Sequence, residues 1–419
     1  MNPEQRKIIF LIGLISLAMT IHLPAQEIIK DGDTYKTTVK NEFQVKPGGK
    51  LIMKRIAGDV TVSSWTKNQV YIEEMLQMSV FTREEADKIL EHTKSQYSQQ
   101  GNTIIVDGSE GKRWIQRKFS VKLPEQFNLD VQTSGGDLTV DVLTGNVDLT
   151  TSGGDIRVNQ IDGAVSVQTS GGDLKLVEIK GPLDAKTSGG DIRLQNLKDN
   201  VTAKTSGGSI RLADAQSNVE LKTSGGDITV TKVGGALSAA TSGGTIDVSD
   251  CQGKVDVHTS GGDILLKNIG GQLEGHTSGG DIQGFDFSNP LNLHTSGGDI
   301  GIKNLRSGIS ARTSAGEIKV EMTLSDFEQP HTIDLCTSAG TIDLTIPARL
   351  PATITAEIHL GDGKRYWDRY DIYSDFPLAK NKIEENGKQI IRSTGEINGG
   401  GDPIKLQTSA GDIRIREGK

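Results

Sequence analysis

The tetrapeptide Thr-Ser-Gly-Gly recurs from Thr133 at an unbroken spacing of eighteen residues, and its eleventh copy reads Thr313-Ser314-Ala315-Gly316. A fixed period of this length is the signature of a solenoid, in which each repeat forms one coil. Stacked coils supply ladders of equivalent side chains and seldom a unique catalytic pocket. The period therefore constrains the architecture of this chain far more than it constrains the ligand.

Each repeat divides into two nine-residue halves, and each half predicts a turn followed by a short strand. Counted from the Thr as position 0, apolar residues fall at positions 5, 7, 10, 14 and 16, which in one coil are Ile156, Val158, Ile161, Val165 and Val167. Stacking at roughly 4.8 Å pairs each coil's backbone with its neighbours. The sequence thus predicts an all-β protein, a parallel β-solenoid or β-helix of 18-residue coils, with these columns inside.

The regular spacing ends after the eleventh coil. The next motif starts at Thr337, which indicates a loop near Leu324–His331, and a last copy starts at Thr408.

Before the coils, a charged helical stretch around Thr82–Gln99 interrupts longer strands, as expected of a cap that shields a strand edge. Four parts are expected: a signal peptide (1–25), an N-terminal β-rich capping region with one helix (27–130), the solenoid of eleven regular coils plus one irregular coil (131–345), and a C-terminal β cap that returns to the solenoid (346–419).

The N-terminus has the features of a secretory signal. Arg6 and Lys7 precede an apolar run, Ile8–Ile21, which is short for a bilayer span, and Leu23-Pro24-Ala25 offers a cleavage site. An uncleaved anchor is the alternative, but the sequence shows no second apolar segment. We therefore expect an exported protein of the periplasm, the outer surface or the medium, with no transmembrane segment in the mature chain.

Composition narrows the possible partners and cross-links. The formal net charge is −8, and no cluster combines basic residues with aromatic ones, so nucleic acid is not an expected partner. Cys251 falls at interior position 10, whereas Cys336 lies several coils away. A disulfide requires Cα atoms within roughly 7 Å, so we expect no bridge between them.

Position 4 is almost always acidic, and Ser209 and Thr245 are its interruptions. Carboxylates stacked at strand spacing repel each other unless something offsets their charge. In the first coils a basic residue stands two positions further on, so we expect a solvated lattice of weak ion pairs. Its basic members are Arg157, Lys175, Arg193 and Arg211.

The coils from Thr241 onward break this pattern, because the basic column ends while the acidic one continues, and position 17 carries histidines. Imidazole and carboxylate together are able to bind a divalent metal, or to form a charge-dependent contact surface below roughly pH 6.5. The simpler interpretation is that the histidines continue a basic stripe on position 17. No firm metal site is predicted, and the candidate ligands are His258, His276, His294, Asp263, Asp281 and Asp299.

A calcium requirement is not expected either. Calcium-binding β-rolls repeat Gly-Gly-x-Gly-x-Asp in every half coil. Here the acidic residue follows Gly-Gly directly and occurs once per eighteen residues, so the ligand geometry does not carry over. The sequence therefore predicts no cofactor.

Several motifs outside the regular coils carry a family resemblance. They are Gly58-Asp59-Val60-Thr61-Val62, Val121-Lys122-Leu123-Pro124, and the closing Ser409-Ala410-Gly411-Asp412-Ile413-Arg414-Ile415. With the eleven coils, they make the chain resemble the bacterial putative-adhesin family of β-strand repeat proteins of unknown function. The resemblance implies a secreted or envelope-associated β-solenoid for which no catalytic residues are established.

Three classes of function remain open. The favoured one is a non-catalytic, adhesin-like binding protein of the envelope or cell surface, with a surface polysaccharide or another envelope protein as partner. A periplasmic structural or envelope-stress scaffold is the alternative. A polysaccharide-acting β-helix enzyme is less favoured, because the acidic residues form a ladder and no unique pair. The most enzyme-like stretch is Asp362–Asp375, for which a capping role is simpler. No catalytic residue is predicted.

Overall fold

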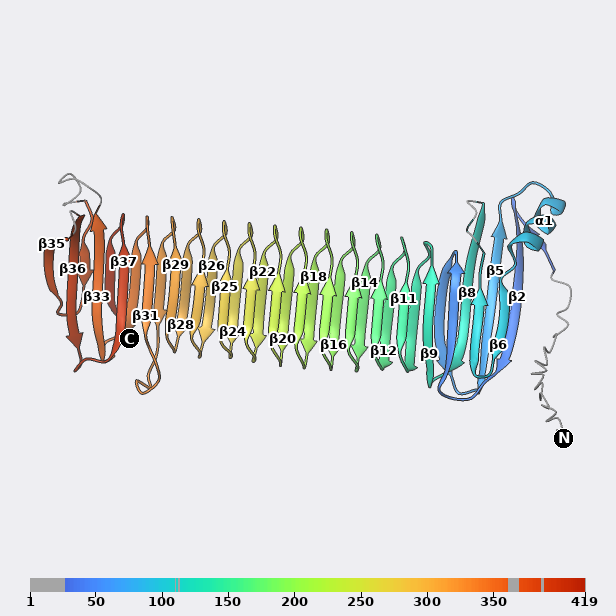
Figure 1. Cartoon of the computed structure of the whole chain (residues 1–419), viewed down its shortest axis with the longest axis horizontal. Coiled ribbons are helices and arrows are strands. Elements are labelled where there is room, and N and C mark those ends of the chain that lie inside the picture. Colours follow the sequence, from blue (N-terminus) through green and yellow to red (C-terminus); the bar gives the residue numbers. More distant parts are fainter. Residues whose placement is uncertain (1–26, 110, 112–113, 361–368, 386–387, 419) are drawn as a thin grey trace, which may run out of the picture.

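The computed structural model describes residues 27–418 apart from 110, 112–113, 361–368 and 386–387. The expected signal peptide, residues 1–25, lies outside these residues. The described chain is a long rod of stacked β-coils with broader β-rich regions at both ends and helix α1 beside the first of them (Figure 1). The predicted parallel β-solenoid is confirmed.

Each coil gives one longer strand to a first sheet and one shorter strand to a second sheet, and each strand pairs in parallel with its equivalents one coil away. The first sheet contains β10 (Leu138–Thr144), β12 (Ile156–Asp162), β14 (Leu174–Ile179), β16 (Ile192–Leu197), β18 (Ile210–Ala215), β20 (Ile228–Val233), β22 (Ile246–Cys251), β24 (Ile264–Ile269), β26 (Ile282–Phe287), β28 (Ile300–Leu305), β30 (Ile318–Met322) and β32 (Ile342–Pro347). The second contains β9 (Phe127–Thr133), β11 (Val147–Thr150), β13 (Val165–Gln168), β15 (Leu183–Lys186), β17 (Val201–Lys204), β19 (Val219–Lys222), β21 (Leu237–Ala240), β23 (Val255–His258), β25 (Leu273–His276), β27 (Leu291–His294), β29 (Ile309–Thr313) and β31 (Ile333–Thr337).

The interior consists of the five predicted apolar columns. In the coil that starts at Thr151, the side chains at positions 5, 7, 10, 14 and 16 are at most 2% exposed. Alternation along each strand turns the residues between these columns to solvent, as the strands' burial patterns show. Cys251 at position 10 is buried and both cysteines are free, as expected.

The threonine at position 0 is a buried corner residue. Thr151 donates its Oγ1 hydrogen to the carbonyl of Gly136 in the preceding coil at 3.0 Å, and it accepts the N–H of Gly154 at 3.4 Å. Equivalent bonds recur along the stack, for example from Thr205 to Gly190. The hydroxyl thus ties adjacent coils together where a buried polar group needs partners.

The second glycine of the motif allows close contact between coils. A Cβ added to Gly154 would lie 2.1 Å from the carbonyl oxygen of Gly136, whereas one added to Gly153 would come no closer than 3.8 Å to a neighbour. Neither glycine has a φ in the left-handed region. The second glycine is therefore required by the close approach of adjacent coils and not by a positive φ.

A left-handed residue does recur in each regular coil up to β28, at position 9. Its φ lies between 50° and 70°. The residue leaves the strand's alternation and returns position 10 to the interior, so every strand bends at the same point and the register with its neighbours is kept. These residues are Val142, Gln160, Glu178, Asn196, Asp214, Lys232, Asp250, Asn268, Asp286 and Asn304.

At the N-terminal end, stacking order differs from chain order. The coil formed by β3 (Gly49–Ile56) and β4 (Asp59–Trp65) lies between the first regular coil and an outer coil, β7 (Thr103–Asp107) with β8 (Ile115–Pro124). Antiparallel strands complete this end: β1 (Ile29–Asp31), β2 (Thr34–Gln44), β5 (Gln69–Met78) and β6 (Gln96–Gln100).

Helix α1 (Arg83–Thr93) is shorter than expected. It begins after Thr82, whose side chain forms a capping box with Glu85, and it packs Ala86 and Leu90 against the N-terminal β-strands. The expected helical stretch to Gln99 is wrong at its end, because the chain after Thr93 turns into β6 and pairs with β7. Among the described residues, no helix has the length and apolar character needed to cross a bilayer.

At the C-terminal end the chain also folds back. After a loop between β30 and β31 it forms β33 (Ala352–Leu360), β34 (Ile372–Ser374), β35 (Ala379–Glu385) and β36 (Lys388–Ile397), and then returns as β37 (Asp402–Thr408) and β38 (Ile413–Gly418). Strands β37 and β38 lie between the coil of β31 and β32 and the outer strands β33 and β34. Thr408 bonds to the Gly340 carbonyl, so the last motif stacks directly on the preceding one.

Candidate functional site

The acidic column at position 4 lies at the corner that precedes the first-sheet strands. Asp155 accepts the backbone N–H of Asp173 through Oδ1 at 2.9 Å, and Asp137 accepts that of Asp155 in the same way. The second oxygen of each carboxylate faces Arg157, at 2.7 Å from Asp155 and 3.5 Å from Asp137. Arg193 and Arg211 form equivalent ion pairs, so three of the four expected basic members are paired, whereas Lys175 is in no ion pair within the described residues. The column has a second task that the acidic pattern does not indicate, which is to satisfy corner N–H groups.

The three aspartates considered as metal ligands perform the same corner task. Asp263 accepts the N–H of Asp281 at 2.9 Å, and Asp281 accepts that of Asp299 at 2.8 Å. Asp299 accepts the N–H of Glu317 at 2.7 Å. The acidic column continues beyond the basic one because each carboxylate bonds to the backbone of the next coil.

The three candidate histidines form a stack along the ends of β23, β25 and β27. The ring centroids of His258 and His276, and of His276 and His294, are 4.9 Å apart, and the rings are parallel within 8°. Partial burial, together with the two neighbouring imidazoles, lowers the pKa of His276. Protonation of the middle ring is therefore disfavoured, since its charge would lie in a partly buried site beside two other imidazoles.

The histidine and aspartate columns do not form one ligand set. Within the part of the chain that the structure describes, no three His, Cys, Asp or Glu side chains gather so as to hold a metal ion. The stacked rings instead form a ladder on the outer surface of the second sheet, between Ala240 and Arg312 in the strand register.

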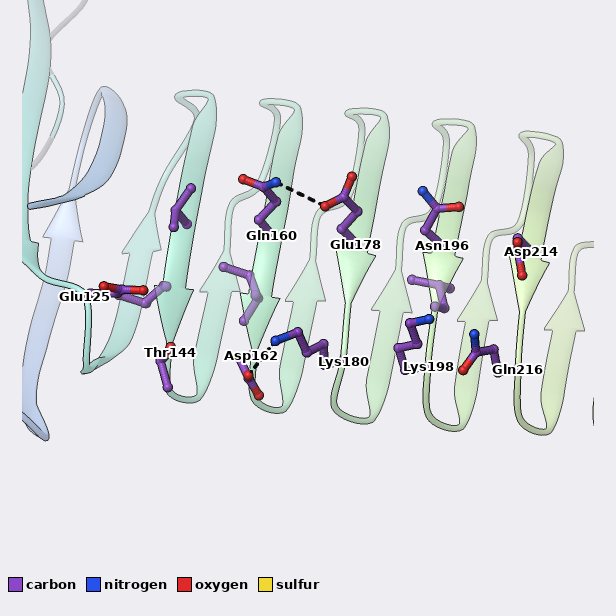
Figure 2. A pocket seen from close by; sticks show the side chains of 14 residues that line it. Glu125, Thr144, Gln160, Asp162, Glu178, Lys180, Asn196, Lys198, Asp214 and Gln216 are labelled. Carbon is purple, nitrogen blue, oxygen red and sulfur yellow. Dashed lines mark hydrogen bonds and ion pairs between the residues drawn. The ribbon is translucent and has the colours of Figure 1, made fainter.

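A groove runs along the rod beside the left-handed residues (Figure 2). It has a volume of ≈ 620 Å³ and crosses the first-sheet strands of consecutive coils. The bend at position 9 turns one row of side chains outward, and position 11 supplies a second row. The labelled rows are Gln160, Glu178, Asn196 and Asp214 at position 9, and Thr144, Asp162, Lys180, Lys198 and Gln216 at position 11.

The side chains that line the groove can form hydrogen bonds, and they include both positively and negatively charged groups. Gln160 donates to Glu178 at 3.1 Å across adjacent coils, and Lys180 donates to Asp162 at 2.8 Å. This hydrogen bond raises the pKa of Lys180. Such an array is suited to non-covalent contact with a polar chain, since donors and acceptors recur from coil to coil.

The sequence contains a signal for this groove at position 9 of the coils. Position 9 is often Asn or Asp, which are the non-glycine residues that adopt the left-handed conformation most readily. The signal is diluted because Val142, Gln160 and Lys232 occupy the same position.

The enzyme-like stretch of the C-terminal region is only partly described. Residues 362–368 lie outside the described residues. Tyr370 is partly buried against the solenoid core, and Asp375 accepts the N–H of Glu417 at 3.0 Å. The described part of this stretch thus packs and bonds onto the last coil.

The fold and its repeated outer surfaces define the protein as a capped parallel β-solenoid. The sequence matches the model of one family, Toastrack DUF4097, over residues 15–239, 177–285 and 235–416. Because these matches span most of the chain, the protein belongs to the Toastrack DUF4097 family. Comparison with curated protein sequences finds no significant match.

Solved structures of low sequence identity are also similar to this chain. A putative adhesin from Bacteroides fragilis is 15% identical, with 68% of this chain and 97% of that chain covered and a TM-score of 0.24. A putative cell adhesion protein from Clostridium sporogenes is 9% identical, with 91% and 100% covered and a TM-score of 0.14. A putative lipid binding protein from Parabacteroides distasonis is 12% identical, with 71% and 96% covered and a TM-score of 0.21. The family assignment rests on the sequence match.

Proposed function

We propose that this protein is a non-catalytic, exported binding protein of the bacterial envelope or cell surface, whose repetitive face contacts a repetitive partner such as a surface polysaccharide. The observation that carries the proposal is the groove of Figure 2, where successive coils present polar side chains at the same two positions. Adjacent coils place equivalent side chains about one strand spacing apart, so a polymer lying along the rod would meet similar groups at each coil.

Multivalent contact supports this role. A single exposed ion pair or hydrogen bond contributes little, on the order of 1 kcal/mol or less. Many such contacts made by one rigid surface with one polymer raise the overall affinity without any single strong site. The length of the solenoid would then set the strength of binding.

Export is supported by the N-terminal sequence, in which Arg6 and Lys7 precede the apolar run Ile8–Ile21. The mature chain would act in the periplasm, on the outer surface or in the medium. A periplasmic scaffold is the second candidate, favoured by the rigid rod with a β cap at each end. The two roles differ in whether the chain is accessible from outside the cell.

The binding proposal is tested with deletions that remove whole coils and keep the register. Deleting Thr187–Lys204 removes one coil of the groove, and deleting Thr151–Lys204 removes three. Affinity for purified envelope polysaccharide, measured by calorimetry, is expected to fall stepwise from the full-length chain to the shorter variants. Circular dichroism checks that both variants keep the β-solenoid. Equal affinity of all three proteins, or no binding by the full-length chain, contradicts the proposal.

A further inference from the structure

The first sheet ends in a strand edge that is only partly covered. Strand β2 lies at the N-terminal end of the rod (Figure 1) and pairs along most of its length with β5. On its other side it pairs only with the short β1, opposite residues 34–36. In the part of the chain that the structure describes, residues 37–44 of β2 have no strand on that side. An edge of this kind is a template for pairing with another strand.

Residues along β2 face β5 and the open edge in turn, because the hydrogen bonds of an antiparallel ladder alternate. Just beyond β2, Val45 donates its N–H to the carbonyl of Asn68 at 3.1 Å, on the side of β5. Counting back in steps of two, the odd-numbered residues of β2 direct their N–H and C=O groups to β5. Lys40 and Glu42 therefore direct theirs to the open edge.

The sequence around Asn41 is complementary to itself when two copies run antiparallel. If Asn41 lies opposite Asn41 of a second copy, Lys40 lies opposite Glu42 twice, and Val39 lies opposite Phe43 twice. Because Lys40 and Glu42 face the edge, this register makes them the hydrogen-bonded pairs of the new ladder. A register centred on Lys40 or on Glu42 would instead bring like charges together.

A polar group at the centre of this register lacks a partner. The Nδ2 atom of Asn41 is buried and has no hydrogen-bond partner within the described residues. Leaving such a group unsatisfied costs about 1–3 kcal/mol. Across the two-fold axis the two Asn41 side chains lie on the same face of the sheet. The terminal amide turns readily about its χ2 torsion, so each Nδ2 is able to donate to Oδ1 of the other copy.

The charges around this edge balance when two copies meet. Lys40 and Glu42 are exposed, and within the described residues neither is in an ion pair. Glu73 of β5 lies beside Lys40 in the register, so a second carboxylate supports each lysine. The nearby Lys36 is already paired with Asp31 of β1. Two copies therefore gain two Lys40–Glu42 pairs and bring no like charges directly opposite each other.

We propose that two copies of the mature chain join end to end through β2, in an antiparallel dimer whose two-fold axis passes between the two Asn41 residues. Residues 39–43 of each copy form the new ladder, and the first sheet of one rod continues into that of the other. The dimer doubles the number of coils in one rod. A five-residue ladder is smaller than a standard interface of about 800 Å² per partner, so we expect dissociation in the micromolar range.

The other end of the rod is less suited to such pairing. There β35 is the outermost strand of the second sheet and pairs only with β36. All but one of its residues are exposed, so a strand added to it would bury little apolar surface. On β2, by contrast, Val39 is buried and Phe43 packs against the core of the solenoid.

Sedimentation velocity of the mature chain from about 1 to about 200 µM tests the proposal and should show a monomer–dimer equilibrium. Lys40→Glu and Glu42→Lys each place like charges opposite, so each variant alone should dimerise at least about tenfold more weakly. An equimolar mixture of the two variants should dimerise again, because every lysine then faces a glutamate of the other chain. Glu384→Lys, on the exposed edge strand β35, is the matched control and should dimerise as the unmodified chain does.

Hydrogen exchange checks where the copies meet. The amides of Lys40 and Glu42 should exchange more slowly in the unmodified chain at high concentration than at low concentration. A chain that stays monomeric over the whole range overturns the proposal, as do a mixture of the two variants that stays monomeric and a dimer that only Glu384→Lys disrupts. The coil deletions that test polysaccharide binding leave β2 intact, so the two proposals succeed or fail separately.

Discussion

The threonine at position 0 stabilises each corner through one hydroxyl group. Thr259 is fully buried, donates to the Gly244 carbonyl at 2.9 Å and accepts the Gly262 N–H at 3.3 Å. Thr259→Val keeps the volume and removes both bonds, so the free energy of unfolding should fall by about 1–3 kcal/mol. Denaturant unfolding measures this, with Ser260→Ala at the exposed neighbour as control. An equal effect of the two substitutions would contradict the role of the hydroxyl.

In the core of one coil, the ring of Phe287 fills the space that the missing side chain of Gly284 leaves. Position 10 carries the large, fully buried Phe287, and a Cβ at Gly284 would lie 2.5 Å from the Cζ atom of that ring. Gly284→Val, which restores an apolar residue of the column, should therefore destabilise the protein by about 1–3 kcal/mol through overpacking. Adding Phe287→Leu should recover most of the loss in the melting temperature. If Gly284→Val alone were as stable as the unmodified chain, the predicted overpacking against Phe287 would be contradicted.

Among the elements, the ends of β23, β25 and β27 carry a pH-sensitive ladder. The pKa of His276 is lowered in the folded state by burial and by His258 and His294, so its protonation favours the unfolded chain. The stability that the neutral His276 ring contributes is fully present above the pKa of the unfolded chain, about 6.5. It is lost as the pH falls through the lower pKa of His276 in the folded state. Asp256 and Glu274 precede the rings on the same strands.

The melting temperature should therefore fall on acidification from neutral pH, and His276→Gln should make that fall smaller. The control is His92→Gln, which lies in helix α1 outside the stack. If His276→Gln and the unmodified chain lost the same stability on acidification, the ladder would have no part in the pH dependence.

The strands of the N-terminal region enclose a buried ion pair between β5 and β8. Glu74 and Arg117 are almost fully buried, with Nη1 and Oε1 3.7 Å apart, and Ser95 and Tyr97 donate hydrogen bonds to the carboxylate. Burial raises the pKa of Glu74. Arg117→Met leaves this carboxylate without its cation and should cost about 3–5 kcal/mol. Glu74→Gln combined with Arg117→Met should be less damaging in thermal unfolding. A double variant no more stable than Arg117→Met would contradict the pairing.

Over the whole molecule, the sequence predicts the solenoid and its interior because one period sets every coil. The columns of Ile156 and its equivalents follow directly from that period. The corner bonds of Asp155 do not, because an acidic column at position 4 also fits a row of exposed ion pairs, and the period does not show that each carboxylate accepts a backbone N–H of the next coil.

The two ends were the least predictable regions. Strands β4 and β38 each lie between neighbours that are distant in the chain, an order that local hydrophobic alternation does not encode. The exposed Phe285 was also not foreseen as a surface feature. Its outward direction follows from the alternation along β26. The sequence alone does not show that Gly301, in the next coil, leaves open space on the same surface.

The central claim is that the rod acts as a binding surface of the cell envelope that is accessible from outside. Protease treatment of intact cells, followed by immunoblotting for this chain and for a periplasmic control protein, tests it most directly. Surface binding predicts loss of the signal for this chain while the control remains intact. Full protection in intact cells, with cleavage after lysis, would contradict that claim and favour a periplasmic scaffold.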